Sequence, residues 1–242
     1  MIASIAWGAL AASSLVLGAA LGLARPWSGR TVGAVLGFGA GALISAVSFD
    51  LAEEGVRLGG ADSVAIGLAL GALTYFLADR FIERPAHLRG RKPMGAGRTS
   101  AGSALALGAF LDGIPEQLVL GIGLIPGQGV SIGLLTAIFV SNLPEAVGSA
   151  TAMREAGHSA GAVMRLWVLA AVICTLATVA GFAIADTASG DLQAVVNGFA
   201  AGALLVMLID TMIPEAVLKA GKIAGLVTVL GFAVAAALSG LE

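Results

Sequence analysis

The chain has 242 residues, of which 58% are hydrophobic and 12% charged, and its formal net charge is -2. A soluble domain carries about 25% charged residues, so this composition, with a mean hydropathy of +0.97, excludes a soluble protein and indicates an integral membrane protein. The single cysteine, Cys174, excludes an internal disulfide framework and a metal site of several cysteines, and its apolar surroundings favour a small buried hydrophobic residue.

Long apolar stretches predict an all-α integral membrane protein with eight spans, because a helix needs about 20 apolar residues to cross a bilayer. The predicted spans, in chain order, are 2–24, 32–54, 61–82, 101–124, 130–152, 160–184, 192–216 and 221–240. They form one transmembrane domain over residues 1–242, and the residue alternation of a β-barrel is not visible. No basic segment precedes the first span, so a cleavable signal peptide is not expected.

The basic residues predict the orientation of these spans. If the N-terminus lies outside, only Arg57 falls on the outer side, and the other Lys and Arg residues lie at inner loops and span ends. These inner residues are Arg25, Arg30, Arg80, Arg84, Arg89, Arg91, Lys92, Arg98, Arg154, Arg165, Lys219 and Lys222. The positive-inside rule then predicts a multi-pass protein with both termini outside. The expected location is the cell (plasma) membrane, or inner membrane. The longest loop, 83–100, is basic and is predicted to be a cytoplasmic linker.

An internal repeat connects the second predicted span with the seventh. Residues 37–43 and 198–204 are identical at six of seven positions, at an offset of 161 that also aligns Glu54 with Glu215. The two spans run in opposite directions in the predicted topology, so the copies are inverted, as they are in many secondary transporters. The first three and last three spans then form inverted repeats around two central spans, a 3+2+3 arrangement.

The two central spans each contain a proline–glutamate pair, within residues 110–116 and 139–145. One carboxylate at the centre of a membrane costs roughly 2.5–3.5 kcal/mol on insertion scales, so several carboxylates there predict a shared cation. Helical spacing places five oxygen-bearing side chains on two surfaces that can face each other: Asp112, Glu116, Ser141, Asn142 and Glu145. Each proline also removes a backbone donor and frees a carbonyl group. The alternative is two proline kinks with protonated carboxylates, or with carboxylates paired to neighbours.

A second group of acidic residues flanks this centre. Asp50, Glu53 and Glu54 end the second predicted span on the outer side, while Asp210 and Glu215 lie toward the inner end of the seventh. In a cation transporter these residues would line an entrance and an exit. The alternative is that they are ordinary carboxylates at the membrane surface.

With these motifs, this topology and this repeat, the chain resembles the ZIP (Zrt-, Irt-like protein) family of divalent metal transporters, of the prokaryotic type. That family has eight spans with both ends outside, a His-Asn-x-Pro-Glu-Gly signature in span 4 and a related proline–glutamate motif in span 5. The matching segments here are Asp112-Gly113-Ile114-Pro115-Glu116-Gln117 and Ser141-Asn142-Leu143-Pro144-Glu145.

The resemblance implies a role for each central residue. Asp112 stands at the position of the family's metal-binding histidine, and Glu116 and Glu145 match its bridging glutamates. Ser141 and Asn142 match further ligand positions in span 5. Span 6 has no acidic residue near its centre, which argues against the second metal that some members bind. A homodimer is also implied by the resemblance.

Two departures from the signature bear on metal preference. Asp112 replaces the histidine, and Gly113 replaces the asparagine, so that ligand is missing. Zinc favours nitrogen and sulfur ligands, whereas oxygen ligands suit manganese, magnesium or ferrous iron. The oxygen ligands thus leave the metal preference open. Zinc is expected because of the family resemblance, with manganese, iron, cadmium or magnesium as alternatives. The metal is expected as the substrate, and no resident cofactor is expected. Membrane lipid is the other expected partner, and binding of nucleic acid is not expected.

The function predicted from these observations is transport of divalent metal cations by alternating access. A non-transporting membrane sensor or structural protein of the same fold is the alternative. An enzyme is not expected, because the sequence has no His-Glu-x-x-His motif and no serine paired with histidine or lysine at membrane depth. An aspartyl protease would need two paired aspartates, but the two deep aspartates of the sequence, Asp112 and Asp210, fall at different depths of the predicted spans. A carrier of anionic substrates would need cations in its core, and none is apparent in the sequence.

Overall fold

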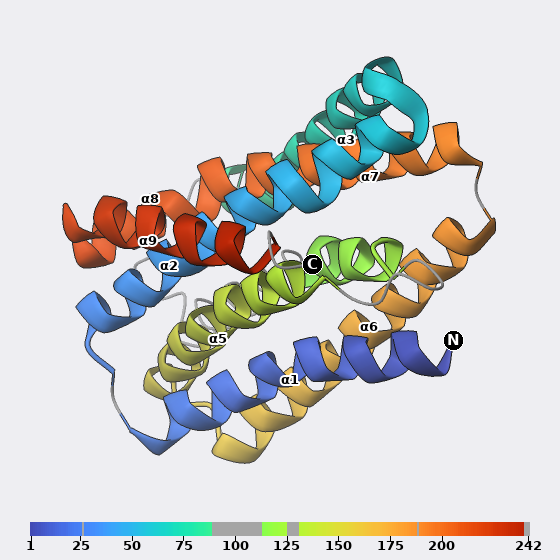
Figure 1. Ribbon diagram of the computed structural model, residues 1–242. Coiled ribbons are helices and arrows are strands. Elements are labelled where there is room, and N and C mark those ends of the chain that lie inside the picture. The colour runs from blue at the N-terminus through green and yellow to red at the C-terminus, as the bar shows by residue number, and fades with distance from the viewer. Residues whose placement is uncertain (26, 89–112, 125–130, 188, 240–242) are drawn as a thin grey trace.

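The computed structural model describes residues 1–25, 27–88, 113–124, 131–187 and 189–239, and these residues form helices joined by short links, with no strand among them (Figure 1). In chain order the elements are α1 (Ile2–Ala24), α2 (Gly29–Ala46), the π-helical segment η1 (Val47–Glu53), α3 (Glu54–Leu88), a helical segment at 113–122, α5 (Ile132–Glu155), α6 (Ala160–Thr187), α7 (Gly190–Met207), the π-helical segment η2 (Leu208–Met212), α8 (Ile213–Ala220) and α9 (Ile223–Ser239).

Five stretches of the described residues are helical, long and apolar enough to cross a membrane. They are Ile2–Ala24, Gly29–Leu77, Ile132–Glu155, Ala160–Ala185 and Gly190–Ala220, and Ile223–Ser239 is apolar but shorter. The prediction of an all-helical, multi-pass membrane protein is therefore confirmed, while the count of eight spans stays a prediction. Residues 101–112 of the predicted fourth span and 89–100 of the predicted linker lie outside the described residues. Helix α3 continues to Leu88, past residue 82, where the sequence predicted its end.

The longest of these stretches is a hairpin of two helices. Gly59 and Gly60 interrupt the helical backbone, with φ of -146° and 81°. The positive φ of Gly60 is strained for a residue with a side chain and free of strain for glycine. The chain therefore reverses here, between residue 54, where the second span was predicted to end, and residue 61, where the third was predicted to begin. The rest of α3 returns along the molecule (Figure 1).

The two copies of the repeat make the same kind of helix–helix contact. A methyl group on Gly41 would collide with the carbonyl group of Thr228 on α9, and one on Gly202 would collide with the carbonyl group of Leu68 on α3. The absence of side chains thus lets the backbones of α2 and α9, and those of α7 and α3, approach closely. Helices α2 and α7, which carry the copies, run in opposite directions (Figure 1).

The π-helical segments follow the same repeat. η1 begins at Val47 and η2 at Leu208, which are separated by the repeat offset of 161. Both segments hold acidic residues that the sequence singled out, Asp50 and Glu53 in η1 and Asp210 in η2. A π-helical turn is rare and is frequent at functional sites, so its occurrence in both copies strengthens the structural repeat.

Helix α5 lies between α1 and α6 on one side and α2 and α9 on the other (Figure 1). Small residues allow this packing. A methyl group on Gly18 of α1 would collide with the carbonyl group of Leu143, and one on Gly39 of α2 would lie 2.8 Å from Cα of Ser141. Both contacted residues are on α5, so the backbones of two neighbouring helices are pressed against α5 at the level of its proline–glutamate pair.

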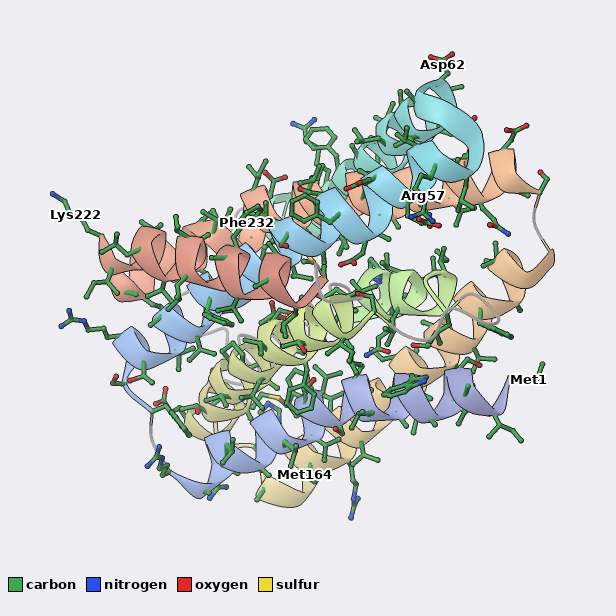
Figure 2. All side chains as sticks on the ribbon, viewed as in Figure 1. Met1, Arg57, Asp62, Met164, Lys222 and Phe232 are labelled. Atoms are coloured by element: carbon green, nitrogen blue, oxygen red, sulfur yellow. The ribbon has the colours of Figure 1, made fainter. Side chains whose placement is uncertain are left out.

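The links α1–α2, α5–α6 and α8–α9 share one end of the molecule. Gly22 of α1 packs on Val147 and Thr151 of α5, and Gly33 of α2 packs on Lys219 of α8. Figure 2 shows Lys222 at this end and Met1 and Asp62 at the opposite end. The end that holds these three links and Lys222 is therefore the basic end, which the positive-inside rule expects in the cytoplasm.

Candidate functional site

The central polar cluster joins the helical segment 113–122 to α5 through a buried carboxylate. Glu116 is only 1% exposed. Its Oε1 atom accepts a hydrogen bond of 3.1 Å from Oγ of Ser141, and its Oε2 atom accepts one of 2.9 Å from Nδ2 of Asn142. Ser141 and Asn142 are themselves buried, so three of the five predicted central residues lie together in the interior.

Neighbouring contacts hold this segment in place. The residue after Glu116 is Gln117, whose Oε1 atom accepts a 2.6 Å hydrogen bond from Oγ1 of Thr178 on α6. Consecutive residues on a helix point about 100° apart, so the segment presents one polar side chain to α5 and the next to α6. Gly121 and Gly181 bring the segment and α6 into backbone contact. The segment that carries Glu116 is thus held by two helices, α5 and α6.

The remaining central residues are placed less completely. Glu145 is half-buried on α5, one turn beyond Ser141. Pro144 lies inside α5, which continues through it as a single helix. Asp112 lies outside the described residues. Within the described ranges no three His, Cys, Asp or Glu side chains gather closely enough to hold a metal ion, so the full ligand set stays a prediction.

Asp50, predicted at the outer entrance, lies where three helices meet. Its Oδ1 atom accepts a 3.0 Å hydrogen bond from Oγ of Ser131, and its Oδ2 atom lies 3.5 Å from Oγ of Ser239 at the end of α9. Ser131 is also the N-cap of α5, where its Oγ atom accepts a 3.1 Å hydrogen bond from the N–H of Leu134. Asp50 therefore ties η1 to the start of α5 and to the end of α9.

We expect Ser131→Ala to destabilise the protein more than Ser159→Ala does. Ser159 caps α6 through a 3.2 Å hydrogen bond from the N–H of Ala162. Loss of a helix cap alone costs about 1 kcal/mol. Ser131→Ala also removes a donor from the carboxylate of Asp50, which adds about 1–3 kcal/mol if that group is left unsatisfied. Thermal unfolding of both variants in detergent measures the difference, and equal losses would show that the contact with Asp50 contributes nothing.

The other flanking acids divide into paired and exposed residues. Glu54 forms an ion pair of 3.1 Å with Arg57, and its repeat counterpart Glu215 forms one with Lys219. Each glutamate thus pairs with a basic residue one helical turn later. Glu53 and Asp210 are exposed.

Sequence reasoning missed three features of this region. The partners of Asp50, the hydrogen bond between Gln117 and Thr178, and the position of Cys174 beside Gly113 all depend on which helices are neighbours. Only Ser131 left a local signal, because a serine directly before an apolar helical stretch is typical of an N-cap.

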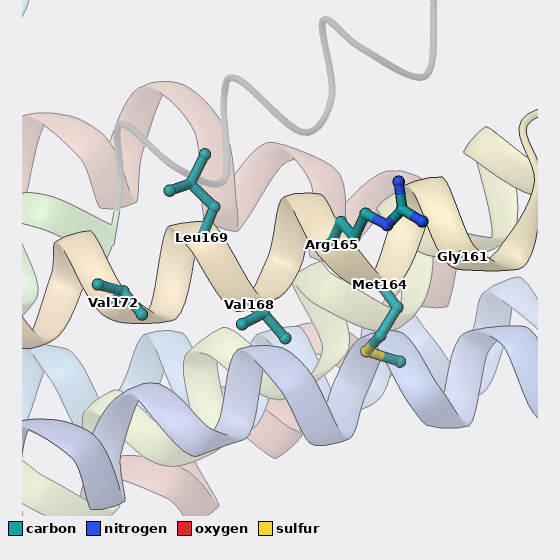
Figure 3. A pocket seen from close by; sticks show the side chains of 6 residues that line it. All are labelled: Gly161, Met164, Arg165, Val168, Leu169 and Val172. Atoms are coloured by element: carbon teal, nitrogen blue, oxygen red, sulfur yellow. The ribbon is translucent and has the colours of Figure 1, made fainter.

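A shallow hollow of about 460 Å³ lies along α6, away from the polar cluster. Figure 3 shows its lining side chains, which all come from this one helix: Gly161, Met164, Arg165, Val168, Leu169 and Val172. It offers no carboxylate, thiol or imidazole ligand, so it is unsuited to hold a metal cation.

Comparison with known proteins agrees with the motifs, although no family model matches the chain. A protein of Arabidopsis thaliana named "Putative zinc transporter At3g08650" is 31% identical over 183 residues, which cover 74% of this chain and 29% of that protein. "Zinc transporter SLC39A7" of Mus musculus is 26% identical over 153 residues, which cover 58% of this chain and 32% of that protein. The chain thus spans about a third of the length of these relatives. Together with the proline–glutamate segments of the two central spans, these similarities show that the chain belongs to the ZIP (Zrt-, Irt-like protein) family.

Proposed function

We propose that this protein transports divalent metal cations across the cell membrane. The observation that carries the proposal is the buried carboxylate of Glu116, held by hydrogen bonds from Ser141 and Asn142 inside a multi-pass membrane protein. Ionisable residues within membrane spans are costly and mark ion pathways in many transporters. The relatives named as zinc transporters make zinc the first candidate substrate.

The proposed metal site contains Glu116, Ser141 and Asn142, together with Asp112 and Glu145. Hydrogen bonds from the serine and the amide fix the rotamer of Glu116, as outer-shell partners do for the ligands of metal sites. A metal ion that sheds water on entry would exchange it for carboxylate and amide oxygens. Such oxygen donors admit manganese, ferrous iron, cadmium and magnesium as well as zinc.

Alternating access is the mechanism that the architecture supports best. The contacts of Gly41 with α9 and of Gly202 with α3, and the π-helical segments at equivalent positions, fit two inverted repeats of three spans around two central ones. In this 3+2+3 arrangement both termini lie outside. Rocking of one repeat unit against the other would expose the central site to each side in turn. Asp50 and Glu54 would line the entrance, and Asp210 and Glu215 the exit. A homodimer is the assembly that the family resemblance implies.

Metal flux into proteoliposomes tests the proposal. We expect saturable uptake of at least one ion among Zn²⁺, Mn²⁺, Fe²⁺, Cd²⁺ and Mg²⁺, and loss of this uptake in Glu116→Ala. Glu155→Ala is the control, because Glu155 is exposed at the end of α5 and should leave flux unchanged. Absence of flux for every ion in the natural sequence would overturn transport and favour the sensor or structural alternative.

A further inference from the structure

Two side chains from different helices face Gly113. A methyl group placed on Gly113 would lie 3.1 Å from Sγ of Cys174 on α6 and 3.8 Å from Oδ1 of Asn142 on α5. These are the atoms that such a methyl group would meet first. The thiol and the amide oxygen therefore approach the same point beside Gly113, and the thiol comes this close because glycine has no side chain.

The amide of Asn142 is oriented so that its oxygen faces Gly113. Its Nδ2 atom donates to Oε2 of Glu116 at 2.9 Å, and the reverse orientation would place two oxygens against each other. Within the part of the chain that the structure describes, Oδ1 of Asn142 has no hydrogen-bond donor, although the residue is only 1% exposed. Leaving a buried acceptor without a partner is unfavourable, and a bound cation would offset this cost.

Cys174 supplies a different kind of donor from the rest of the cluster. It is fully buried, at 0% exposure, and it is the single cysteine of the chain. Thiolate sulfur is a soft ligand that favours zinc and cadmium, whereas manganese and magnesium prefer oxygen. The sequence favoured a small buried hydrophobic residue at this position, and the structure places the thiol at the edge of the proposed metal site.

We propose that Cys174 is a metal ligand that, with Oδ1 of Asn142 and the carboxylate of Glu116, makes a mixed sulfur–oxygen site selecting zinc and cadmium over manganese and magnesium. This inference rests on the proposed transport function and names the selectivity of the same site. The sulfur enters the space that Gly113 leaves where the ZIP signature has asparagine. On binding, the thiol proton is displaced and leaves with the water that the ion sheds.

Cadmium binding by the purified full-length protein tests the ligand directly. A sulfur–cadmium bond gives a charge-transfer absorption in the ultraviolet, and because the chain has one cysteine, this band can come only from Cys174. We expect the band in the natural sequence, its loss in Cys174→Ser and Cys174→Ala, and a weaker band in Glu116→Ala and Gly113→Ala. Thr175→Ala is the control, because the hydroxyl of Thr175 bonds to the carbonyl group of Ala171 within α6.

Flux measurements then test selectivity. We expect Cys174→Ser to lower the ratio of cadmium to manganese uptake by about tenfold or more, the scale on which changes around a metal alter its affinity. Thr175→Ala should keep the natural ratio. No cadmium band in the folded natural sequence, a band that Glu116→Ala leaves at full strength, or an unchanged flux ratio would each overturn the assignment.

The two proposals fail in different ways. A cadmium band without flux of any ion would overturn transport and retain the sulfur–oxygen site. Flux that depends on Glu116, with the same ion ratio in Cys174→Ser, would retain transport and overturn the role of Cys174. If Cys174→Ser does not fold, Cys174→Ala and the binding assay on Gly113→Ala decide the question.

Discussion

Glu116→Gln is expected to abolish metal transport while the protein remains folded. The amide oxygen of glutamine can still accept one hydrogen bond from Ser141 or Asn142, so the contact between the segment 113–122 and α5 is partly kept. The negative charge that would neutralise the cation is lost. We expect uptake to fall by more than about 100-fold, because losing even a supporting group outside the ligands costs about 10–100-fold in metal affinity.

Two measurements distinguish an effect of the lost charge on transport from an effect of the substitution on folding. Size-exclusion chromatography in detergent should show the same single peak for the variant as for the natural sequence. Uptake in proteoliposomes, normalised to the reconstituted protein, should fall to the level of empty vesicles. Uptake near that of the natural sequence would mean that the carboxylate of Glu116 is only a structural hydrogen-bond acceptor, and the proposed site would have to be abandoned.

The second large effect is expected for Gly41→Ala and Gly202→Ala. Each added methyl group would collide with a backbone carbonyl group, that of Thr228 for Gly41 and that of Leu68 for Gly202. A backbone cannot rotate away as a side chain can, so the paired helices must separate. Overpacking of this kind costs about 1–3 kcal/mol, and occasionally more. We expect both variants to unfold at clearly lower temperatures in detergent.

Gly225→Ala is the matched control for this pair. Gly225 lies on α9, and an added methyl group would meet no atom within 4 Å. Alanine is favoured over glycine in a helix by about 1 kcal/mol, so this control should be neutral or slightly stabilising. Equal unfolding temperatures for Gly41→Ala and Gly225→Ala would show that the close contact between α2 and α9 does not limit stability.

Prediction from the sequence was most successful where a residue type is unusual for its surroundings, such as a polar residue in an apolar span. Glutamate and asparagine inside apolar stretches are costly. Helical spacing placed Glu116, Ser141 and Asn142 on surfaces that can face each other, and in the structure these residues are hydrogen-bonded. The Gly-rich repeat likewise indicated two equivalent helices, and its glycines make equivalent contacts. In both cases the local residue type restricted the environment strongly.

Other features could not be predicted because they depend on which helices become neighbours. The hydrogen bond between Gln117 and Thr178 requires the segment 113–122 to pack on α6. The two π-helical segments leave no mark in apolar periodicity that separates them from an ordinary helix. Cys174 was predicted to be a small buried residue and is buried, and only the position of Gly113 opposite its sulfur leads to the second role that we propose for it.

The π-helical segments also mark the places where each long helix changes its packing partner. Before η1, Gly41 of α2 faces α9, and after it Gly55 faces Asn197 of α7. Before η2, Gly202 of α7 faces α3, and after it the chain around Lys219 packs on Gly33 of α2. Each long helix is therefore shared between two partners, one on either side of its π turn. The two helix pairs are therefore interlocked, and we expect a tilt of one pair to displace a helix segment that packs in the other.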